Sequence, residues 1–182
     1  MIRLVVYAVL SVPIVWVSRR SLRRPAAHGF WRFFAFEAIL GLIVLNVPHG
    51  FRRPLDFLQI ASWVFLTVSL LFVVWGFVLL RRLGGFRPTA EAEPPFEWEK
   101  TGRLVTTGIY HYIRHPMYSS LLFLAWGVVV KFVTPATLTL GAVASLAVLA
   151  AAKAEEAENL ARFGDEYREY MRRTRRFVPF LL

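Results

Sequence analysis

Cysteine is absent from this 182-residue sequence, and charged residues are scarce. Without cysteine, disulfide bonds, thiolate metal sites and a cysteine nucleophile are all excluded. Charged residues make up 19% of the chain and hydrophobic residues 57%, with a mean hydropathy of +0.50. A soluble domain carries about 25% charged residues. The excess of apolar residues therefore indicates that lipid rather than water covers much of the molecular surface.

Apolar residues gather in five stretches, which predict an all-α integral membrane protein with about five transmembrane helices. The stretches cover residues 2–17, 30–47, 58–80, 117–133 and 137–152. The first lacks the basic start and the cleavage site of a signal peptide, so we expect a retained helix. The last two are short and are joined by KFVTPAT, which predicts a helical hairpin whose second helix starts at Pro135. We expect one membrane-embedded domain over residues 1–182.

The net charge of +10 comes mainly from basic residues that flank the apolar stretches. These residues do not form one face of a polar domain, so we expect no nucleic-acid partner. With five crossings, most of them lie on the side of the first loop, the third loop and the C-terminus. The positive-inside rule then predicts an outside N-terminus and a cytoplasmic C-terminus, with the basic residues against anionic lipid headgroups.

The polar segment that ends the chain predicts three features. The fifth helix continues to about Phe163, breaks at Gly164 and is followed by a short cytoplasmic amphipathic helix. The final RRTRRFVPFLL is interpreted as a basic amphipathic membrane anchor.

The stretch YHYIRHPMYSS comes directly before the fourth apolar run. Pro116 suits the first turn of a helix, where its missing N–H costs nothing. The free N–H groups of that turn attract a carboxylate or phosphate, and Arg114 could hold the same anion through two hydrogen bonds. A plainer interpretation also stands: Arg114 and His115 reach into lipid headgroups while the tyrosines form an aromatic belt.

Two adjacent acids, Glu155 and Glu156, begin the exit of the fifth helix. Acidic groups near a helix C-terminus oppose the helix dipole, so their presence needs a partner. They could bind a cation or pair with Arg114, or they could form a solvated helix end with Lys153 or Arg162. The predicted hairpin brings them close to the Arg-His-Pro stretch, where an anion site, a cation site and aromatic faces would suit a zwitterionic ligand.

Glu37 lies inside the second apolar stretch, and an ionisable residue within a membrane is a functional candidate. Because Arg32 is close in the sequence, we expect an interfacial ion pair and leave Glu37 outside the active site. We expect no metal site, and nothing in the sequence is typical of a phosphate-binding glycine loop or a serine triad.

Taken together, LVTTGIYHYIRHPMYSS, EEAENLARFGDEYREYMRR and FVPF resemble the isoprenylcysteine carboxyl methyltransferase and phospholipid N-methyltransferase superfamily. The resemblance covers residues 100–182, whereas the helices of residues 1–80 match only in being apolar. The positions that carry it are Gly108, Tyr110, Arg114, His115, Pro116, Tyr118, Glu155, Glu156, Phe163, Gly164, Tyr167 and Tyr170.

This resemblance implies a multi-pass membrane enzyme that uses S-adenosylmethionine. It implies that the amino-acid end of this cofactor lies near His115, Glu155 and Glu156. The adenosine is then expected near Gly108, Tyr110 and Tyr118, and the reacting centre at the catalytic residues Arg114 and Glu156.

Three positions depart from the family pattern. Ile109 stands where the family often has proline, and Glu158 and Asn159 stand where apolar residues are usual. The extra acid leaves open which of Glu155, Glu156 and Glu158 is essential.

The function implied is methyl transfer at the cytoplasmic membrane face to a lipophilic acceptor that enters from the bilayer. An isoprenylcysteine-like carboxylate or a phospholipid amine is expected, and a smaller thiol or isoprenoid acid stays open. A carboxylate would need only positioning by Arg114, whereas an amine or thiol must lose a proton, which Glu156 could accept. Two other functions stay open: a nicotinamide-dependent reductase of the sterol-reductase type, and a non-catalytic membrane scaffold. The sequence leaves the oligomeric state undetermined.

Overall fold

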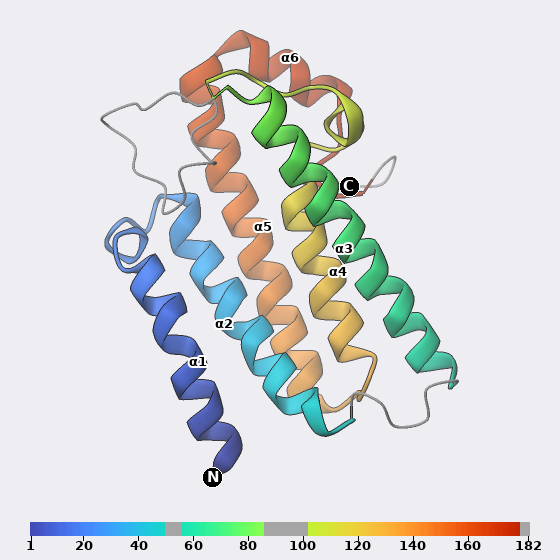
Figure 1. Cartoon of the computed structure of the whole chain (residues 1–182). Coiled ribbons are helices and arrows are strands. Elements are labelled where there is room, and N and C mark those ends of the chain that lie inside the picture. The colour runs from blue at the N-terminus through green and yellow to red at the C-terminus, as the bar shows by residue number, and fades with distance from the viewer. Residues whose placement is uncertain (50–55, 86–101, 179–182) are drawn as a thin grey trace.

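The computed structural model describes residues 1–49, 56–85 and 102–178, and long helices dominate these residues (Figure 1). The described part contains no strand, and its β-type pairing is one isolated parallel bridge between Ile113 and Arg175. The elements in chain order are α1 (Ile2–Ser18), η1 (Ser21–Arg23), α2 (His28–Asn46), η2 (Val47–His49), α3 (Phe57–Leu83), η4 (Gly108–His111), α4 (Pro116–Val129), α5 (Pro135–Phe163) and α6 (Asp165–Arg173). The predicted all-α fold is confirmed.

Three helices, α2, α3 and α5, are long and apolar enough to cross a membrane. The apolar helices α1 and α4 are shorter. The five predicted stretches correspond to α1–α5, although α3 extends past residue 80 and α4 ends before residue 133. Apolar side chains are exposed along the outer faces of α1 and α3, as expected where lipid replaces water as the solvent.

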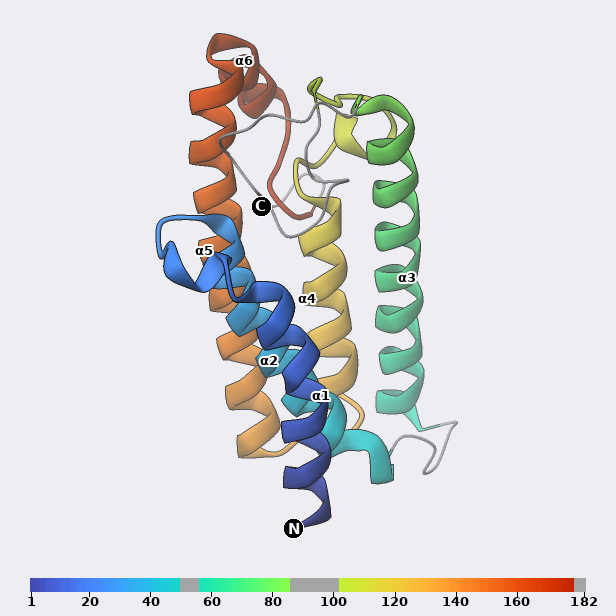
Figure 2. The ribbon, with the colours of Figure 1, turned by 60° about the vertical axis from the view of Figure 1, so that its left-hand side comes forward.

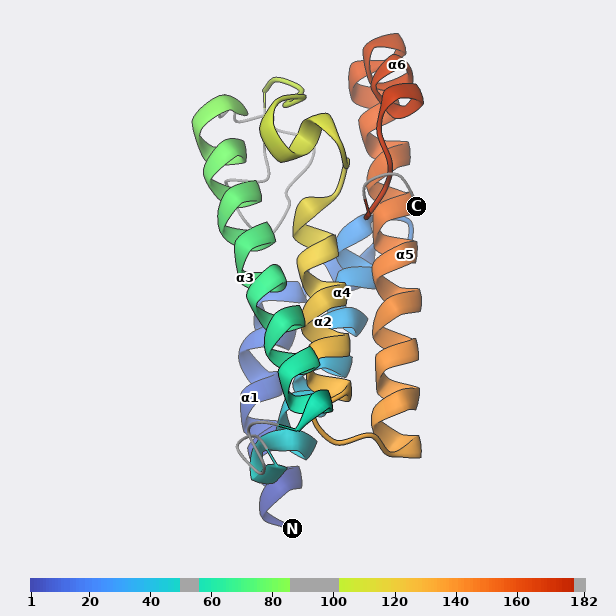
Figure 3. The same ribbon diagram turned by 90° about the vertical axis from the view of Figure 1, so that its right-hand side faces the viewer.

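The helix α4 lies between α3 and α5, and it packs against both (Figure 3). The helix α2 packs against α5 and α4, and α1 packs against α2 (Figure 2). Buried hydroxyl groups join α3 to α4, because Ser62 donates to the Gly127 carbonyl at 2.6 Å and Ser69 to the Ser120 carbonyl at 2.7 Å. Such small polar residues let two apolar helices approach closely.

The fifth helix begins and ends where the local sequence predicts. Thr134 and Thr137 form a capping box, in which the Thr137 N–H donates to Thr134 Oγ1 at 3.2 Å and the Thr134 N–H to Thr137 Oγ1 at 2.9 Å. Pro135 follows in the first turn, which confirms the predicted start. The predicted break at Gly164 is confirmed too, because Gly164 has a φ of +58° and separates α5 from α6.

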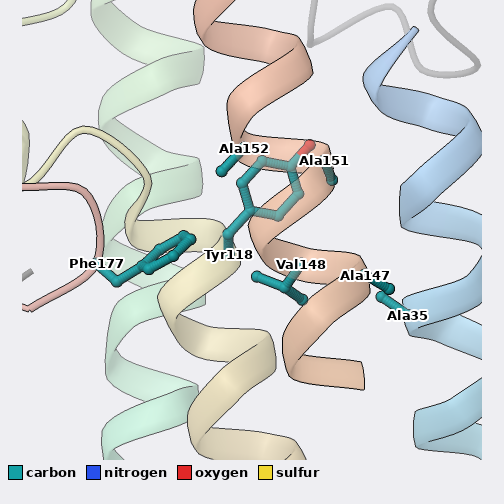
Figure 4. Packing of buried hydrophobic residues seen from close by; sticks show 7 residues of the cluster. All are labelled: Ala35, Tyr118, Ala147, Val148, Ala151, Ala152 and Phe177. Atoms are coloured by element: carbon teal, nitrogen blue, oxygen red, sulfur yellow. The ribbon is translucent and has the colours of Figure 1, made fainter. Parts of the chain in front are cut away.

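The core between α4, α5 and α2 is built mainly from small residues that surround the ring of Tyr118. Figure 4 shows Tyr118 of α4 lying against Ala151 and Ala152 of α5, with Phe177 from the C-terminal segment nearby. Ala35 brings α2 into the same cluster. The alanines of α5 leave room for the ring, which fixes the spacing between α4 and α5.

The residues that follow α6 correct one prediction. Residues 174–178 form no helix and fold back toward the start of α4 (Figure 3). The Arg114 N–H donates to the Arg175 carbonyl at 2.8 Å, the Arg175 N–H to the Tyr112 carbonyl at 3.0 Å, and the His115 N–H to the Arg176 carbonyl at 3.1 Å. Phe177 is buried. The interpretation of this segment as a membrane anchor is therefore wrong for residues 174–178, because backbone pairing and the core hold them; residues 179–182 lie outside the described part.

Glu37 is also placed differently from the prediction. Its two carboxylate oxygens accept hydrogen bonds from α1, one from the Tyr7 hydroxyl at 2.7 Å and one from the Ser11 hydroxyl at 2.6 Å. The Arg32 guanidinium lies 5.9 Å from the ring of Phe36. The structure thus joins Glu37 to α1 through hydroxyl groups, where we expected an ion pair with Arg32.

Candidate functional site

The candidate site lies where η4, the start of α4, the end of α5 and the C-terminal segment meet, at the end of the bundle away from Met1 (Figure 1). Gly108 opens η4 with a φ of +61°. A Cβ at this position would lie 2.6 Å from Leu79 Cδ1, so the positive φ and the close approach to α3 both favour glycine here. Pro116 is in the first turn of α4, which places Arg114 and His115 directly at the mouth of that helix.

The centre of the site is Glu156, whose side chain is only 6% exposed. Arg114 Nε donates to Oε1 of Glu156 at 2.9 Å. Arg176 Nε donates to the same oxygen at 3.0 Å, and Arg176 Nη2 donates to Oε2 at 2.6 Å. Two guanidinium groups therefore share one buried carboxylate, and the predicted pairing of Arg114 with Glu156 is present.

Arg114 also ties the site to the end of α6. Its Nη1 donates to the Met171 carbonyl at 3.2 Å and to the carbonyl of Thr174. The side chain is 8% exposed, so the headgroup interpretation of Arg114 does not fit the structure. A buried guanidinium needs several such partners, because each unpaired N–H would cost free energy.

His115 lies between the two predicted acids. Its Nδ1 is 3.8 Å from Glu155 Oε1, and its Nε2 is 3.4 Å from Glu156 Oε1. The imidazole is buried, and within the described residues Nε2 makes no hydrogen bond. Glu155 is more open, with 33% of its side chain exposed. The site thus presents a partly exposed carboxylate beside a buried imidazole whose Nε2 makes no hydrogen bond to the described residues.

Tyr110 is buried beside these groups. Its hydroxyl donates to the Gly76 carbonyl at 3.4 Å, and its own carbonyl accepts from the Tyr170 hydroxyl at 2.7 Å. Burial, with the charge of Glu155 as a smaller contribution, raises the pKa of the Tyr110 phenol well above its usual range. Tyr110 therefore acts as a neutral hydrogen-bonding group and an aromatic surface.

The predicted residues fall into two groups in the structure. One group converges at the site: Arg114, His115, Glu155 and Glu156. Tyr110 is close enough that the charge of Glu155 contributes to the raised pKa of its phenol. Gly108 lies instead against α3, and Tyr118 lies in the core with its ring centroid 5.5 Å from that of His115 (Figure 4).

The additional acid Glu158 has a separate role. It accepts a hydrogen bond from the backbone N–H of His28 at 3.0 Å, and its second oxygen lies 2.6 Å from His28 Nδ1. His28 is the first residue of α2, where backbone N–H groups have no partner within the helix. Glu158 therefore caps α2 from α5.

Arg176 is the site residue that the sequence analysis did not identify. The tail was interpreted by its composition, and the abundance of arginine gave no reason to prefer one of them. No period-two pattern separates Arg176 from Arg175, because the buried residues Thr174 and Phe177 are three positions apart with both arginines between them.

Comparison with known proteins identifies the family. The Phospholipid methyltransferase family model matches residues 58–165. The chain belongs to the phospholipid methyltransferase family. This match begins within α3 and includes Arg114, His115, Glu155 and Glu156, but it ends at the first residue of α6 and does not include Arg176.

Two curated relatives carry the same type of name. The chain is 30% identical over 122 residues to methanethiol S-methyltransferase 1 of Bradyrhizobium diazoefficiens, a match to 66% of this chain and 39% of that protein. It is 30% identical over 76 residues to the methanethiol S-methyltransferase of Crocosphaera subtropica, a match to 42% of this chain and 29% of that protein. The matched part thus spans less than half of either relative. No solved structure matches the chain.

Proposed function

We propose that this protein is an S-adenosylmethionine-dependent membrane methyltransferase that acts on a lipophilic acceptor at the cytoplasmic face of the bilayer. The observation that carries the proposal is the convergence of Arg114, His115, Glu155 and Glu156 at one end of the bundle, inside the family match. The names of both relatives support methyl transfer.

The chemistry of the site fits the methyl donor. S-adenosylmethionine combines an ammonium, a carboxylate and a sulfonium, and it supplies an electrophilic methyl group. Glu155 offers a partly exposed carboxylate for the ammonium, and His115 offers a buried nitrogen without a hydrogen bond in the described part of the chain. Tyr110 adds an aromatic surface close to Glu155.

In this proposal the residues bind, orient and exclude water. Glu155 and His115 hold the amino-acid end of the donor, and the neutral Tyr110 lines the adenosine side, with Gly108 allowing η4 to lie close to α3. Arg114 positions the acceptor. Because Arg114, His115 and Glu156 are buried, they act in a site of low dielectric constant, where alignment and the absence of water contribute much of the rate enhancement.

The proposed placement in the membrane rests on the apolar helices and on the distribution of basic residues. We propose that α1–α5 cross the bilayer, with the N-terminus outside and the C-terminus in the cytoplasm. The helix α6 then lies on the cytoplasmic side with exposed arginines toward anionic headgroups, and the acceptor enters sideways from the lipid.

A thiol acceptor is a specific alternative to the carboxylate and the phospholipid amine. Both curated relatives are named for S-methylation of methanethiol, whereas the family name refers to phospholipids. A carboxylate or thiolate is negative and an ammonium is positive, so the charged side chains of the site would bind them differently.

The first test is thermal unfolding of the detergent-purified protein with and without S-adenosylhomocysteine. At about one hundred times its dissociation constant, a ligand adds about 2.7 kcal/mol to the free energy of unfolding. We expect this stabilisation in the parent and its loss in Glu155→Gln, because Glu155 holds the ammonium. The matched control is Glu158→Gln, on the same helix but bonded to His28, which we expect to keep the stabilisation.

Absence of stabilisation in the parent would overturn the proposed donor. Stabilisation of the parent by a nicotinamide cofactor would then support the reductase alternative, and no response to either ligand would support a scaffold.

A further inference from the structure

Arg176 adds a second cation to the site from a segment that the family match does not include. The C-terminal segment carries it between the start of α4 and the end of α5 (Figure 3). Ser119 Oγ donates to the Phe177 carbonyl at 2.6 Å, so the residue that follows Arg176 is also bound to α4. Arg176 is therefore held in place by the backbone and not only by its ion pair.

Both guanidinium groups keep a nitrogen for a ligand. Arg114 uses Nε and Nη1, and Arg176 uses Nε and Nη2. Within the described residues, Arg114 Nη2 and Arg176 Nη1 make no hydrogen bond. The Arg176 side chain is 26% exposed, compared with 8% for Arg114, so it can contact a ligand that approaches the buried centre.

The local charges decide which acceptor suits this centre. Among the described arginine and glutamate side chains that meet at Glu156, the two guanidinium charges balance the carboxylates of Glu155 and Glu156. A bound S-adenosylmethionine adds one net positive charge. An acceptor that reacts as an anion makes the loaded site neutral, whereas an ammonium would add a second positive charge in a site of low dielectric constant.

Glu156 also lacks the freedom to act as a base. Both of its oxygens already accept hydrogen bonds from guanidinium groups, so a substrate proton would have to displace an arginine. A carboxylate carries no proton to remove, whereas a thiol must release its proton to solvent and bind as the thiolate; an ammonium would need a proton acceptor within the site.

We propose that the acceptor is a lipophilic carboxylate or thiolate that reacts as an anion, and that Arg176 with Arg114 selects it. The inference rests on the proposed methyltransferase function and names the class of its acceptor. An electron pair of the acceptor oxygen or sulfur forms the new bond to the methyl carbon. The bond from this carbon to the sulfonium sulfur breaks and leaves its electron pair on that sulfur. The products are a methyl ester or thioether and S-adenosylhomocysteine, and no proton is transferred.

The binding test uses two probes of equal chain length and opposite charge. Thermal unfolding is measured in S-adenosylhomocysteine with decanoate or with decylamine. We expect decanoate to raise the unfolding temperature of the parent and decylamine not to do so. Arg176→Ala should lose the response to decanoate while it keeps the response to S-adenosylhomocysteine. The control is Arg175→Ala, because the neighbouring side chain is exposed and its removal keeps the backbone pairing.

The activity test measures transfer from labelled S-adenosylmethionine to decanoate, decanethiol and decylamine. We expect the carboxylate or the thiol to be methylated in preference to the amine, and the comparison of these two identifies the reacting atom. Arg176→Ala should raise the KM for the anionic acceptor about tenfold or more. Arg176→Lys should recover part of this loss, because it restores the charge without the bidentate geometry.

Two results would overturn the inference alone: a parent that binds S-adenosylhomocysteine but methylates decylamine as well as the anions, or an Arg176→Ala variant that loses S-adenosylhomocysteine and decanoate binding equally. A parent that does not bind S-adenosylhomocysteine would overturn the proposed function and the inference with it.

Discussion

Glu156 is the side chain on which three separate parts of the chain converge. Its carboxylate joins α5 to Arg114 before α4 and to Arg176 in the C-terminal segment. The hydrogen bonds to Glu156 raise the pKa of the Arg176 guanidinium above its already high value, so Arg176 stays charged. Glu156 therefore holds the C-terminal segment against the end of α5 through Arg176.

Removal of this negative charge should therefore destabilise the protein. We expect Glu156→Gln to lower the free energy of unfolding by about 3–5 kcal/mol, because it leaves two guanidinium groups near the core without a counter-charge. Glu169→Gln is the control, since Glu169 pairs with Arg172 and Arg173 on the exposed face of α6 and such pairs contribute little. Chemical denaturation in detergent measures both variants, and equal stability of the two would contradict this role of Glu156.

At the scale of the element, the short helix η4 depends on two separate requirements at Gly108. The residue has a positive φ, and it lies where any side chain would clash with Leu79 of α3. Gly164 shares the positive φ but has open space around it. The two glycines thus allow backbone strain to be separated from close packing.

Alanine at each of these positions should destabilise the protein to different degrees. Backbone strain alone costs about 1–3 kcal/mol, which we expect for Gly164→Ala. Gly108→Ala should cost more, because its Cβ would lie 2.6 Å from Leu79 Cδ1 and either the Leu79 side chain or η4 would have to move. Thermal unfolding and the affinity for S-adenosylhomocysteine are measured for both. Equal losses at the two positions would show that packing against α3 is not limiting.

At the scale of the whole molecule, the direction of the helices can be tested directly because the chain contains no cysteine. Single variants Arg3→Cys and Arg172→Cys place one thiol at each end of the bundle, and the Arg172 side chain is exposed. In intact cells we expect a membrane-impermeant maleimide to label the first variant only, and permeabilised cells to label both. Labelling of both in intact cells would show an even number of crossings and contradict the proposed orientation.

Much of the fold follows from local sequence. Pro135 with its Thr134 cap, the break at Gly164 and the apolar lengths of the helices depend on neighbouring residues, so they were predictable before the structure was known. The grouping of Arg114, His115, Glu155 and Glu156 was predictable as well, because a helical hairpin brings the start of α4 to the end of α5.

The roles of other residues depend on contacts between distant parts of the chain. Glu158 caps α2, Glu37 binds two hydroxyl groups of α1, and Tyr118 fills the core beside the alanines of α5. None of these partners is close in the sequence, so composition and spacing gave no signal for the pairing.

The sequence by itself determined an all-helical, lipid-compatible chain and the residue types of its site, because hydrophobic length, caps and helix breaks act over a few residues. The tertiary structure decided that residues 174–178 return to pair with residues 112–115 and deliver Arg176 to Glu156. The buried carboxylate of Glu156 needs a cation beside it, and the folded backbone decides which arginines can reach it. The packing of α4 against α5 creates the position in which Arg114 and Arg176 meet this carboxylate.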